Sequence, residues 1–126
     1  FRIAGVGTRE GEYRELADRL GIAAHVKWLG LLDRTQVRDA LQACDAFVLT
    51  SRHESFGVVY AEAIACGKPV IATRCGGPED IVTDVNGLLV PVGDVEAIAI
   101  TRRCDGVLTA RARYHASCHA MPRWPG

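Results

Sequence analysis

Short apolar runs alternate with amphipathic stretches from residue 1 to about residue 100, and this alternation constrains the fold more than any other feature. The runs resemble strands buried in a parallel sheet, and the stretches between them have helical apolar spacing. Strict alternation predicts a three-layer α/β domain, a parallel sheet with helices on both faces. Strands are expected at 2–6, 25–29, 46–49 (a central strand), 69–73 and 88–90, and helices at 10–20, 33–43 and 57–66, with shorter ones from Pro78 and Asp94.

Composition places the chain among ordinary globular proteins. It has the length of one domain, with 126 residues, 48% of them apolar and 24% charged. Fifteen basic and fifteen acidic residues cancel, so no net field favours nucleic acid as a partner, and no apolar run approaches the roughly 20 residues of a membrane helix. Five cysteines without a C-x-x-C pair predict a reduced, cytoplasmic setting, in which Cys44 and Cys66 act as small hydrophobes.

The C-terminal residues depart from the alternating pattern, so we expect a domain at 1–103 and a divergent tail at 104–126. The tail has no clean periodicity and ends in a proline-containing segment that cannot continue a helix. Four of its side chains could in principle hold zinc, but their spacing matches no common zinc finger, which favours chance clustering: Cys104, His115, Cys118 and His119.

Three loops are expected to lie at the ligand-binding edge of the predicted sheet. Ligands of such sheets bind at the carboxyl ends of the strands, near the point where the strand order reverses. The loops at 5–7, 50–57 and 73–78 all follow predicted strands. A dinucleotide dehydrogenase is disfavoured, because Gly5 and Gly7 are not followed by the third glycine of G-x-G-x-x-G: position 10 is Glu10.

The strongest local signal is the segment from Glu54 to Glu62. Gly57 lies where a helix is expected to start, and the unpaired N–H groups of a helix start suit a diphosphate, which glycine allows to come close. Glu62 is the only charged residue between 58 and 66, so its carboxylate must face water or a partner such as two ribose hydroxyls. An exposed stripe of an amphipathic helix explains Glu62 equally well.

Other polar residues near this segment have two interpretations each. Glu54 follows a strand, where active-site residues collect, but it could be a solvated loop carboxylate. Arg52 and His53 could neutralise phosphate or simply lie on the surface. The pair Gly76-Gly77 forms either an anion-binding turn or a plain strand-to-helix turn.

In this order the motifs resemble the C-terminal, donor-binding domain of the retaining glycosyltransferases called glycosyl transferases group 1. The resemblance covers residues 1 to about 100 and centres on E-x(7)-E, Glu54 and Glu62 with Phe56-Gly57 inside it. The flanking matches are A-C-D-A-F-V-L at 43–49, A-I-A-C-G-K-P-V-I-A-T at 63–73, G-G-P-E-D-I-V at 76–82, N-G-L-L-V at 86–90 and Gly93-Asp94. It implies a Rossmann-like domain, one half of a GT-B fold.

The resemblance also implies roles for single residues. Glu54 would contact the sugar hydroxyls of a nucleoside diphosphate sugar and act as the catalytic residue, and Glu62 would bind the ribose. The backbone of Phe56, Gly57 and Val58 would hold the diphosphate. Gly30 and Leu31 would lie beside the nucleobase. No metal or other cofactor is expected, because helix termini and basic side chains would neutralise the charge.

Departures from the family pattern bear on activity. An earlier strand with an Arg and a Lys would precede Phe1, and the N-terminal acceptor domain is absent, so the chain alone is expected to be inactive. Any peripheral association with a membrane would come from that absent half. Thr50 replaces a common proline. Three alternatives remain. The first is a non-catalytic module that binds a nucleotide or a protein partner, and the second is a plain α/β domain without ligand. The third is a sugar-nucleotide epimerase, which the Phe56-Gly57 context and the E-x(7)-E pair disfavour.

Overall fold

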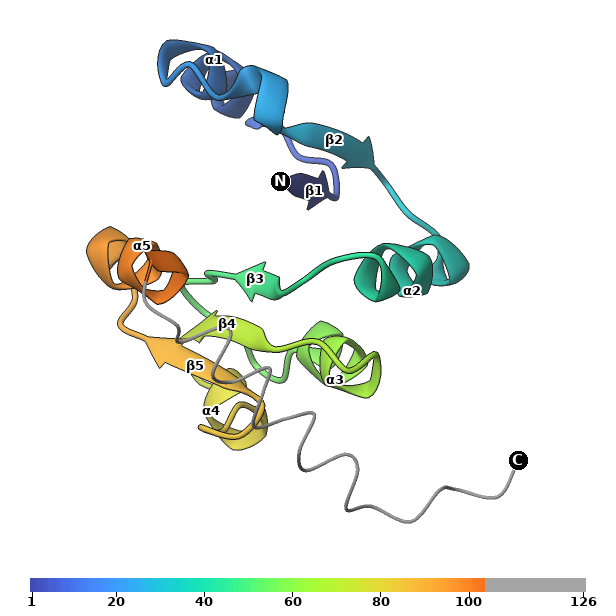
Figure 1. Ribbon diagram of the computed structural model, residues 1–126, viewed down its shortest axis with the longest axis vertical. Helices are drawn as coiled ribbons and strands as arrows, with labels where there is room; N and C mark the ends of the chain where they lie inside the picture. The colour runs from blue at the N-terminus through green and yellow to red at the C-terminus, as the bar shows by residue number, and fades with distance from the viewer. Residues whose placement is uncertain (104–126) are drawn as a thin grey trace. The chain divides into compact units, whose positions relative to one another are not determined.

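The computed structural model describes residues 1–103, with side chains up to residue 99. The chain forms two compact units, Phe1–Val37 and the residues from Arg38 onward, and each is described by itself. Both units contain parallel strands connected through helices (Figure 1). The α/β class with parallel sheets, predicted from the alternation, is confirmed.

The first unit is built on two parallel strands. β1 (Arg2–Ala4) pairs with β2 (Lys27–Gly30), and the two are joined through α1 (Glu10–Arg19) and the short 3-10 turn η1 (Ala23–His25). The second strand begins two residues later than predicted, because N–H of His25 bonds to the carbonyl of Ile22 at 2.8 Å within that turn. Backbone geometry becomes extended only at Val26.

Helix α2 (Arg34–Gln42) contains the boundary between the units. Its start is a reciprocal capping box. N–H of Gln36 donates to the Asp33 carboxylate at 2.8 Å, and N–H of Asp33 donates to Gln36 Oε1 at 2.9 Å. The sequence prediction that Asp33 caps this helix is therefore confirmed.

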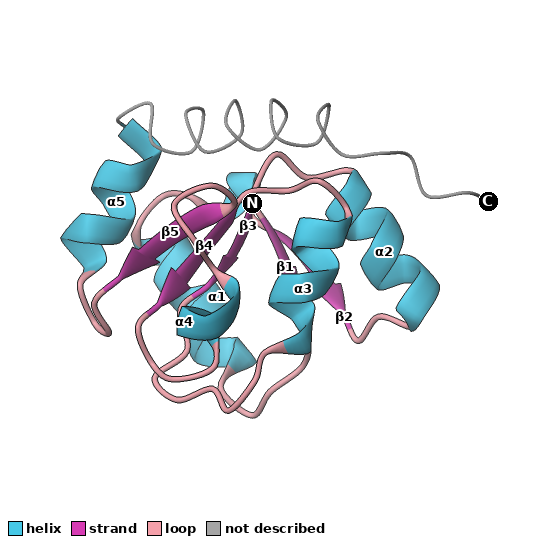
Figure 2. Ribbon diagram, turned by 90° about the horizontal axis from the view of Figure 1, so that it is seen from below, coloured by secondary structure: helices cyan, strands magenta, loops and turns pink. Residues whose placement is uncertain are grey.

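The second unit has a three-stranded parallel sheet in the order β3-β4-β5 (Figure 2). Its strands are β3 (Phe47–Leu49), β4 (Val70–Thr73) and β5 (Gly87–Val90). All four residues of β4 are buried, as expected for a central parallel strand. β3 lies at one end of this unit's sheet, and Val48 is 45% exposed. The central position predicted for 46–49 concerns a sheet that includes the strands of the first unit, so it stays a prediction.

Three helices accompany this sheet: α3 (Val58–Ala65), α4 (Pro78–Ile81) and α5 (Val95–Arg103). α3 contacts β4 and α4, and α5 contacts β5. Three predicted helix ends are confirmed. Pro78 begins α4, and Gly67, with φ +72°, follows the end of α3. Asp94 caps the start of α5, because its carboxylate accepts a hydrogen bond from N–H of Ala97 at 2.8 Å. None of the helices in the described part is long and apolar enough to span a membrane.

The core of the second unit forms where α3 meets the sheet. Tyr60 of α3 is fully buried, and its ring meets Phe47 of β3 edge-on, with centroids 6.0 Å apart. Further buried apolar residues come from α3, the strands and the segment after α4: Ala63, Val70, Ile71, Ala72, Val82 and Val90. This packing holds α3 close to the carboxyl ends of β3 and β4. The Cys104, His115, Cys118 and His119 cluster lies outside the described residues.

Candidate functional site

The loops that follow β3 and β4 pair through their backbones. N–H of Glu54 donates to the carbonyl of Cys75 at 3.3 Å, and N–H of Gly77 donates to the carbonyl of Glu54 at 2.7 Å. These bonds make a single parallel bridge between Glu54 and Gly76. Two of the three loops expected at the ligand-binding edge, 50–57 and 73–78, are thus brought together, and the backbone of Glu54 is fixed.

Gly76 and Gly77 make this close approach possible. A Cβ atom on Gly77 would lie 2.6–2.7 Å from backbone atoms of Phe56, and one on Gly76 would lie 2.9 Å from the carbonyl oxygen of Glu54. Gly76 also has φ +116°, a conformation that side-chain-bearing residues rarely adopt. The glycine pair is therefore more than a plain strand-to-helix turn. It lets the backbone of the loop that carries Glu54 pack directly against the backbone of residues 76 and 77. The adjacent glycines were the only sequence signal for this contact.

Gly57 has a structural role that the sequence did not reveal. It is the N-cap of α3 with φ +77° and ψ +58°, in the left-handed region. A Cβ atom there would lie 2.3 Å from Cδ2 and 2.4 Å from Cε2 of Tyr60, and 3.2 Å from Cγ of Glu54. Glycine is thus required by backbone conformation and by packing, besides any approach of an anion.

Tyr60 packs against the start of α3. The sequence did not identify it as part of the site. Its hydroxyl donates to the carbonyl of Leu49, the last residue of β3, at 3.3 Å. Burial raises the pKa of Tyr60 above its ordinary value. The only sequence signal was a large aromatic residue three positions after Gly57 in a helix of otherwise small and aliphatic residues.

Thr73 ties the end of β4 to the loop after β3. Its side chain is almost fully buried, and its hydroxyl donates to the carbonyl of Ser51 at 2.5 Å. Together with the Glu54–Gly77 bond, this contact holds the β3 loop at two points. The loop that carries the predicted site residues is therefore anchored to the neighbouring strand.

The start of α3 offers backbone N–H groups for a ligand. The first N–H groups of a helix have no intrahelical acceptor, and no side chain caps this helix. Phe56 and Val58, on either side of Gly57, have exposed side chains. N–H of Phe56 makes only a 3.4 Å contact with Oε1 of Glu54. An anion can be bound at such a terminus.

The two glutamates of the E-x(7)-E motif occupy the same unit and the same helix neighbourhood. Glu54 is half-buried beside the start of α3, and Glu62 is half-buried on the second turn of that helix. Glu62 is less exposed than three small or apolar residues of the same helix: Val58, Ala61 and Ala65. Within the described residues, Glu62 forms no ion pair. Its carboxylate is available for a ligand, and its role stays a prediction.

Basic side chains also occur on the anchored loops. Arg52 and His53 are exposed in the β3 loop, and Arg74 is exposed directly after β4. The ion pairs described in α1, in α2 and in the segment before α1 do not involve these three side chains. For Arg52 and His53, both predicted interpretations stay open: neutralisation of a phosphate or a plain surface position.

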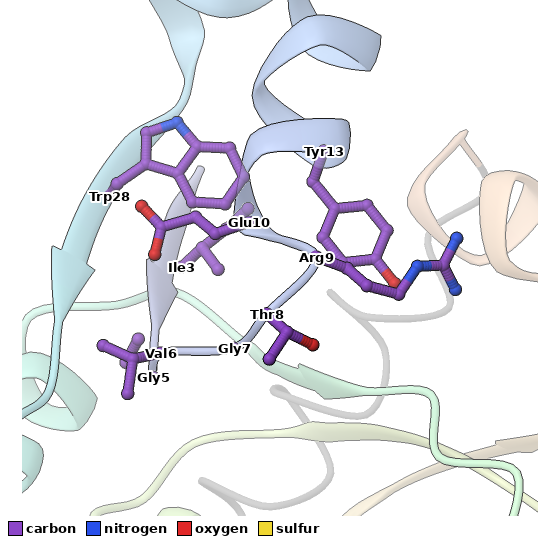
Figure 3. A pocket seen from close by; sticks show the side chains of 10 residues that line it. Ile3, Gly5, Val6, Gly7, Thr8, Arg9, Glu10, Tyr13 and Trp28 are labelled. Carbon is purple, nitrogen blue, oxygen red and sulfur yellow. The ribbon is translucent and has the colours of Figure 1, made fainter.

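The remaining predicted site residues belong to the first unit. Gly30 ends β2 with φ +66°, and Leu31, the next residue, is 78% exposed. The loop at 5–7, also in this unit, borders an open hollow of about 360 Å³ (Figure 3). Glu54 and Glu62 belong to the second unit, so the placement of Gly30 and Leu31 beside a nucleobase stays a prediction.

The hollow lies between the two-stranded sheet and the start of α1. Figure 3 shows Ile3 and Trp28 on the sheet side and Tyr13 on α1. Cζ of Arg14 lies 4.7 Å from the centroid of the Trp28 ring, and Nη2 of Arg14 forms an ion pair with Oε1 of Glu10 at 2.6 Å. Its basic group is therefore already engaged within the unit.

Comparison with known proteins agrees with the order of these motifs. Residues 1–105 match the family model described as glycosyl transferases group 1, which is most of the chain. The chain belongs to this family.

Relatives in the glycosyl transferases group 1 family are considerably longer than this chain. The lipopolysaccharide core biosynthesis glycosyltransferase LpsE of Rhizobium meliloti is 40% identical over 98 residues, which are 77% of this chain and 28% of LpsE. A GDP-mannose-dependent monoacylated alpha-(1-6)-phosphatidylinositol monomannoside mannosyltransferase of Corynebacterium glutamicum is 38% identical over 104 residues, 77% of this chain and 27% of that protein. The chain thus spans between a quarter and a third of these relatives.

Solved structures support the same assignment of the fold. The Anabaena protein HepE, solved in complex with UDP-glucose, superposes with a TM-score of 0.76 at 31% identity, over 91% of this chain and 34% of HepE. TarM superposes with a TM-score of 0.80 at 22% identity. The described fold matches the C-terminal half of GT-B glycosyltransferases, as the resemblance implied.

Proposed function

We propose that this chain binds the nucleoside diphosphate sugar of a retaining glycosyltransferase that transfers a hexose to an acceptor hydroxyl. The observation that carries the proposal is the anchored start of α3. Glu54 is fixed on paired loops beside helix N–H groups that lack an intrahelical acceptor. Membership of the glycosyl transferases group 1 family supports the reaction class.

In this proposal the diphosphate lies at the start of α3. Backbone N–H groups of Phe56, Gly57 and Val58 donate to its oxygens, and the helix dipole favours its negative charge. Exposure of Phe56 and Val58 supports access from solvent. The reaction develops negative charge on the departing diphosphate, so fixed donors at this point stabilise the transition state.

The two glutamates would bind the two ends of the donor. Each residue of an α-helix advances about 1.5 Å, so the Cα of Glu62 lies about 6 Å along the axis from that of Val58. This separation supports ribose binding by Glu62 when the diphosphate lies at the helix start. Glu54, beside that start, would contact the sugar hydroxyls and stabilise positive charge at the anomeric carbon.

The donor proposed is a uridine or guanosine diphosphate sugar, with Gly30 and Leu31 beside its base. HepE was solved with UDP-glucose, and the Corynebacterium relative is named as GDP-mannose-dependent. Helix N–H groups and basic side chains would neutralise the diphosphate without a metal. The proposed location is the cytoplasm, where nucleotide sugars and reduced cysteines occur together.

We further propose that the isolated chain binds the donor without transferring the sugar. It spans only 34% of HepE, so the acceptor side of the cleft would come from the remaining part of a GT-B protein. A non-catalytic nucleotide-binding module is the alternative function. Sugar transfer on addition of an N-terminal GT-B half would support the enzyme, and binding with no transfer would support the module.

Calorimetric titration of the chain with UDP-glucose and GDP-mannose tests the proposal. One of the two is expected to bind, and Glu62→Ala is expected to weaken that binding by about tenfold or more, because hydrogen bonds to a charged group contribute about 1.5–3 kcal/mol. Glu96→Ala is the matched control, since Glu96 is an exposed glutamate on α5. Equal affinity of the two variants would contradict the ribose role of Glu62, and no binding of either donor would contradict the proposed function.

A further inference from the structure

Glu79 is engaged with the loop at 73–78, which pairs with the loop that carries Glu54, although the Glu79 side chain is exposed. It lies in the first turn of α4, and its Oε2 accepts a hydrogen bond from N–H of Gly76 at 2.8 Å. N–H of Glu79 in turn donates to the carbonyl of Gly76 at 3.1 Å. Gly76 is thus held by both its polar backbone groups to one residue.

This pair of bonds acts on the backbone that supports Glu54. Gly76 forms the parallel bridge with Glu54, and the next N–H, that of Gly77, donates to the Glu54 carbonyl at 2.7 Å. Glycine has the largest conformational freedom of any residue, and Gly76 has no side chain to restrain its φ of +116°. The carboxylate of Glu79 supplies a restraint that the glycines cannot supply themselves.

We propose that Glu79 is a positioning residue for the donor site. Through Gly76 and Gly77 it fixes where the Glu54 carboxylate stands relative to the start of α3. The inference rests on the proposed function, because it takes Glu54 to contact the donor sugar. Loss of the Glu79 carboxylate lets the Gly76–Gly77 backbone sample other conformations, so Glu54 spends less time in the geometry that binds sugar.

A merely structural role for Glu79 has a different signature. Capping of α4, a short helix, would change the stability of that helix and leave the two ends of the donor equally affected. A positioning role acts on the sugar end of the ligand and leaves the nucleotide end largely intact. UDP, which lacks the sugar, therefore serves as the internal comparison for UDP-glucose.

Three variants separate these roles. Glu79→Ala removes the acceptor, Glu79→Gln keeps an acceptor oxygen without the charge, and Asp80→Ala removes an equal charge from the neighbouring exposed residue in the same helical turn. Amide hydrogen exchange is measured at Gly76 and Gly77. Affinities for UDP-glucose and UDP are measured by calorimetry on the same samples.

The proposal expects faster exchange at Gly76 and Gly77 in Glu79→Ala, with a loss of about fivefold to tenfold in UDP-glucose affinity and a smaller loss for UDP. Glu79→Gln restores most of both, and Asp80→Ala matches the parent chain. Equal losses for UDP and UDP-glucose, or exchange and affinity unchanged in Glu79→Ala, would overturn this inference alone. If the parent chain binds GDP-mannose and not UDP-glucose, the same comparison is made with GDP-mannose and GDP. Failure of the parent chain to bind UDP-glucose and GDP-mannose alike would overturn the inference together with the proposed function.

Discussion

Gly57→Ala tests the packing at the start of α3. The substitution places a Cβ atom in a left-handed backbone conformation, φ +77°, and within 2.3–2.4 Å of two ring carbons of Tyr60. Tyr60 cannot easily move away, because its ring is buried, meets Phe47 edge-on and donates a hydrogen bond to Leu49. The structure therefore predicts a large loss of stability from one added methyl group.

The magnitude follows from two separate costs. A side-chain-bearing residue in the left-handed region costs about 1–2 kcal/mol. Overpacking a well-filled core costs about 1–3 kcal/mol more. The free energy of unfolding should therefore fall by about 2–5 kcal/mol, which at a slope of about 2 kcal/mol per molar of urea lowers the midpoint by roughly 1–2.5 M.

Gly93→Ala isolates the backbone cost. Gly93 has a similar φ of +81° in the same unit, and a Cβ atom there would meet no atom within 4 Å. Urea unfolding of both variants is followed by far-ultraviolet circular dichroism. The reasoning requires Gly57→Ala to be less stable than Gly93→Ala by the overpacking cost, and equal midpoints would refute the close approach of Tyr60 to Gly57.

Three further predictions concern the supports of the site and the fold. Thr73→Val keeps the shape but leaves the Ser51 carbonyl without its donor, so urea unfolding should show a loss of about 1–3 kcal/mol, and an unchanged midpoint would count against the bond. Burial raises the pKa of Tyr60, so its contribution to the free energy of unfolding is complete below about pH 10 and is lost as the pH rises further. Above about pH 10, the free energy of unfolding of Tyr60→Phe should fall less steeply than that of the parent chain. Parallel curves of unfolding free energy against pH would exclude the effect. Asp33→Ala should cost about 0.5–2 kcal/mol in thermal unfolding through loss of the bond from Gln36, with no cost expected if the cap were absent.

Local signals explain why much of the fold could be predicted. Asp33, Pro78 and Asp94 begin helices through chemistry that acts within three or four residues, and Gly67 ends one in the same way. The buried character of 70–73 follows from its continuous apolar run. Such features need no knowledge of distant parts of the chain.

Contacts between segments could not be predicted in the same way. The role of the Gly76–Gly77 pair depends on Phe56 and Glu54, some twenty residues earlier, and no local pattern identifies that partner. Tyr60 fits the helical pattern like any apolar residue, so its contact with Gly57 depends on backbone geometry. The late start of β2 reflects a 3-10 turn whose hydrogen bonds compete with the extended conformation that the residue types favour.

The candidate site was predicted in part. The sequence identified the loop with Glu54, the helix start at Gly57 and Glu62 as candidates, because a helix start and a single charge in an apolar segment have clear chemical consequences; that Glu62 is half-buried comes from the structure. Glu79 was passed over because first-turn carboxylates are common, and nothing in its spacing showed that it would bond to Gly76. Gly30 and Leu31 belong to the first unit, so their part in the site still depends on the family resemblance.

Amide chemical-shift mapping of the nitrogen-15-labelled chain with UDP-glucose and, separately, with GDP-mannose tests donor binding at the start of α3 most directly. Binding as proposed predicts saturable shifts concentrated at the amides of Phe56, Gly57 and Val58, with a smaller response at Glu62. Saturable shifts that spare residues 54–62, or no shifts at all with either donor at millimolar concentration, would contradict it.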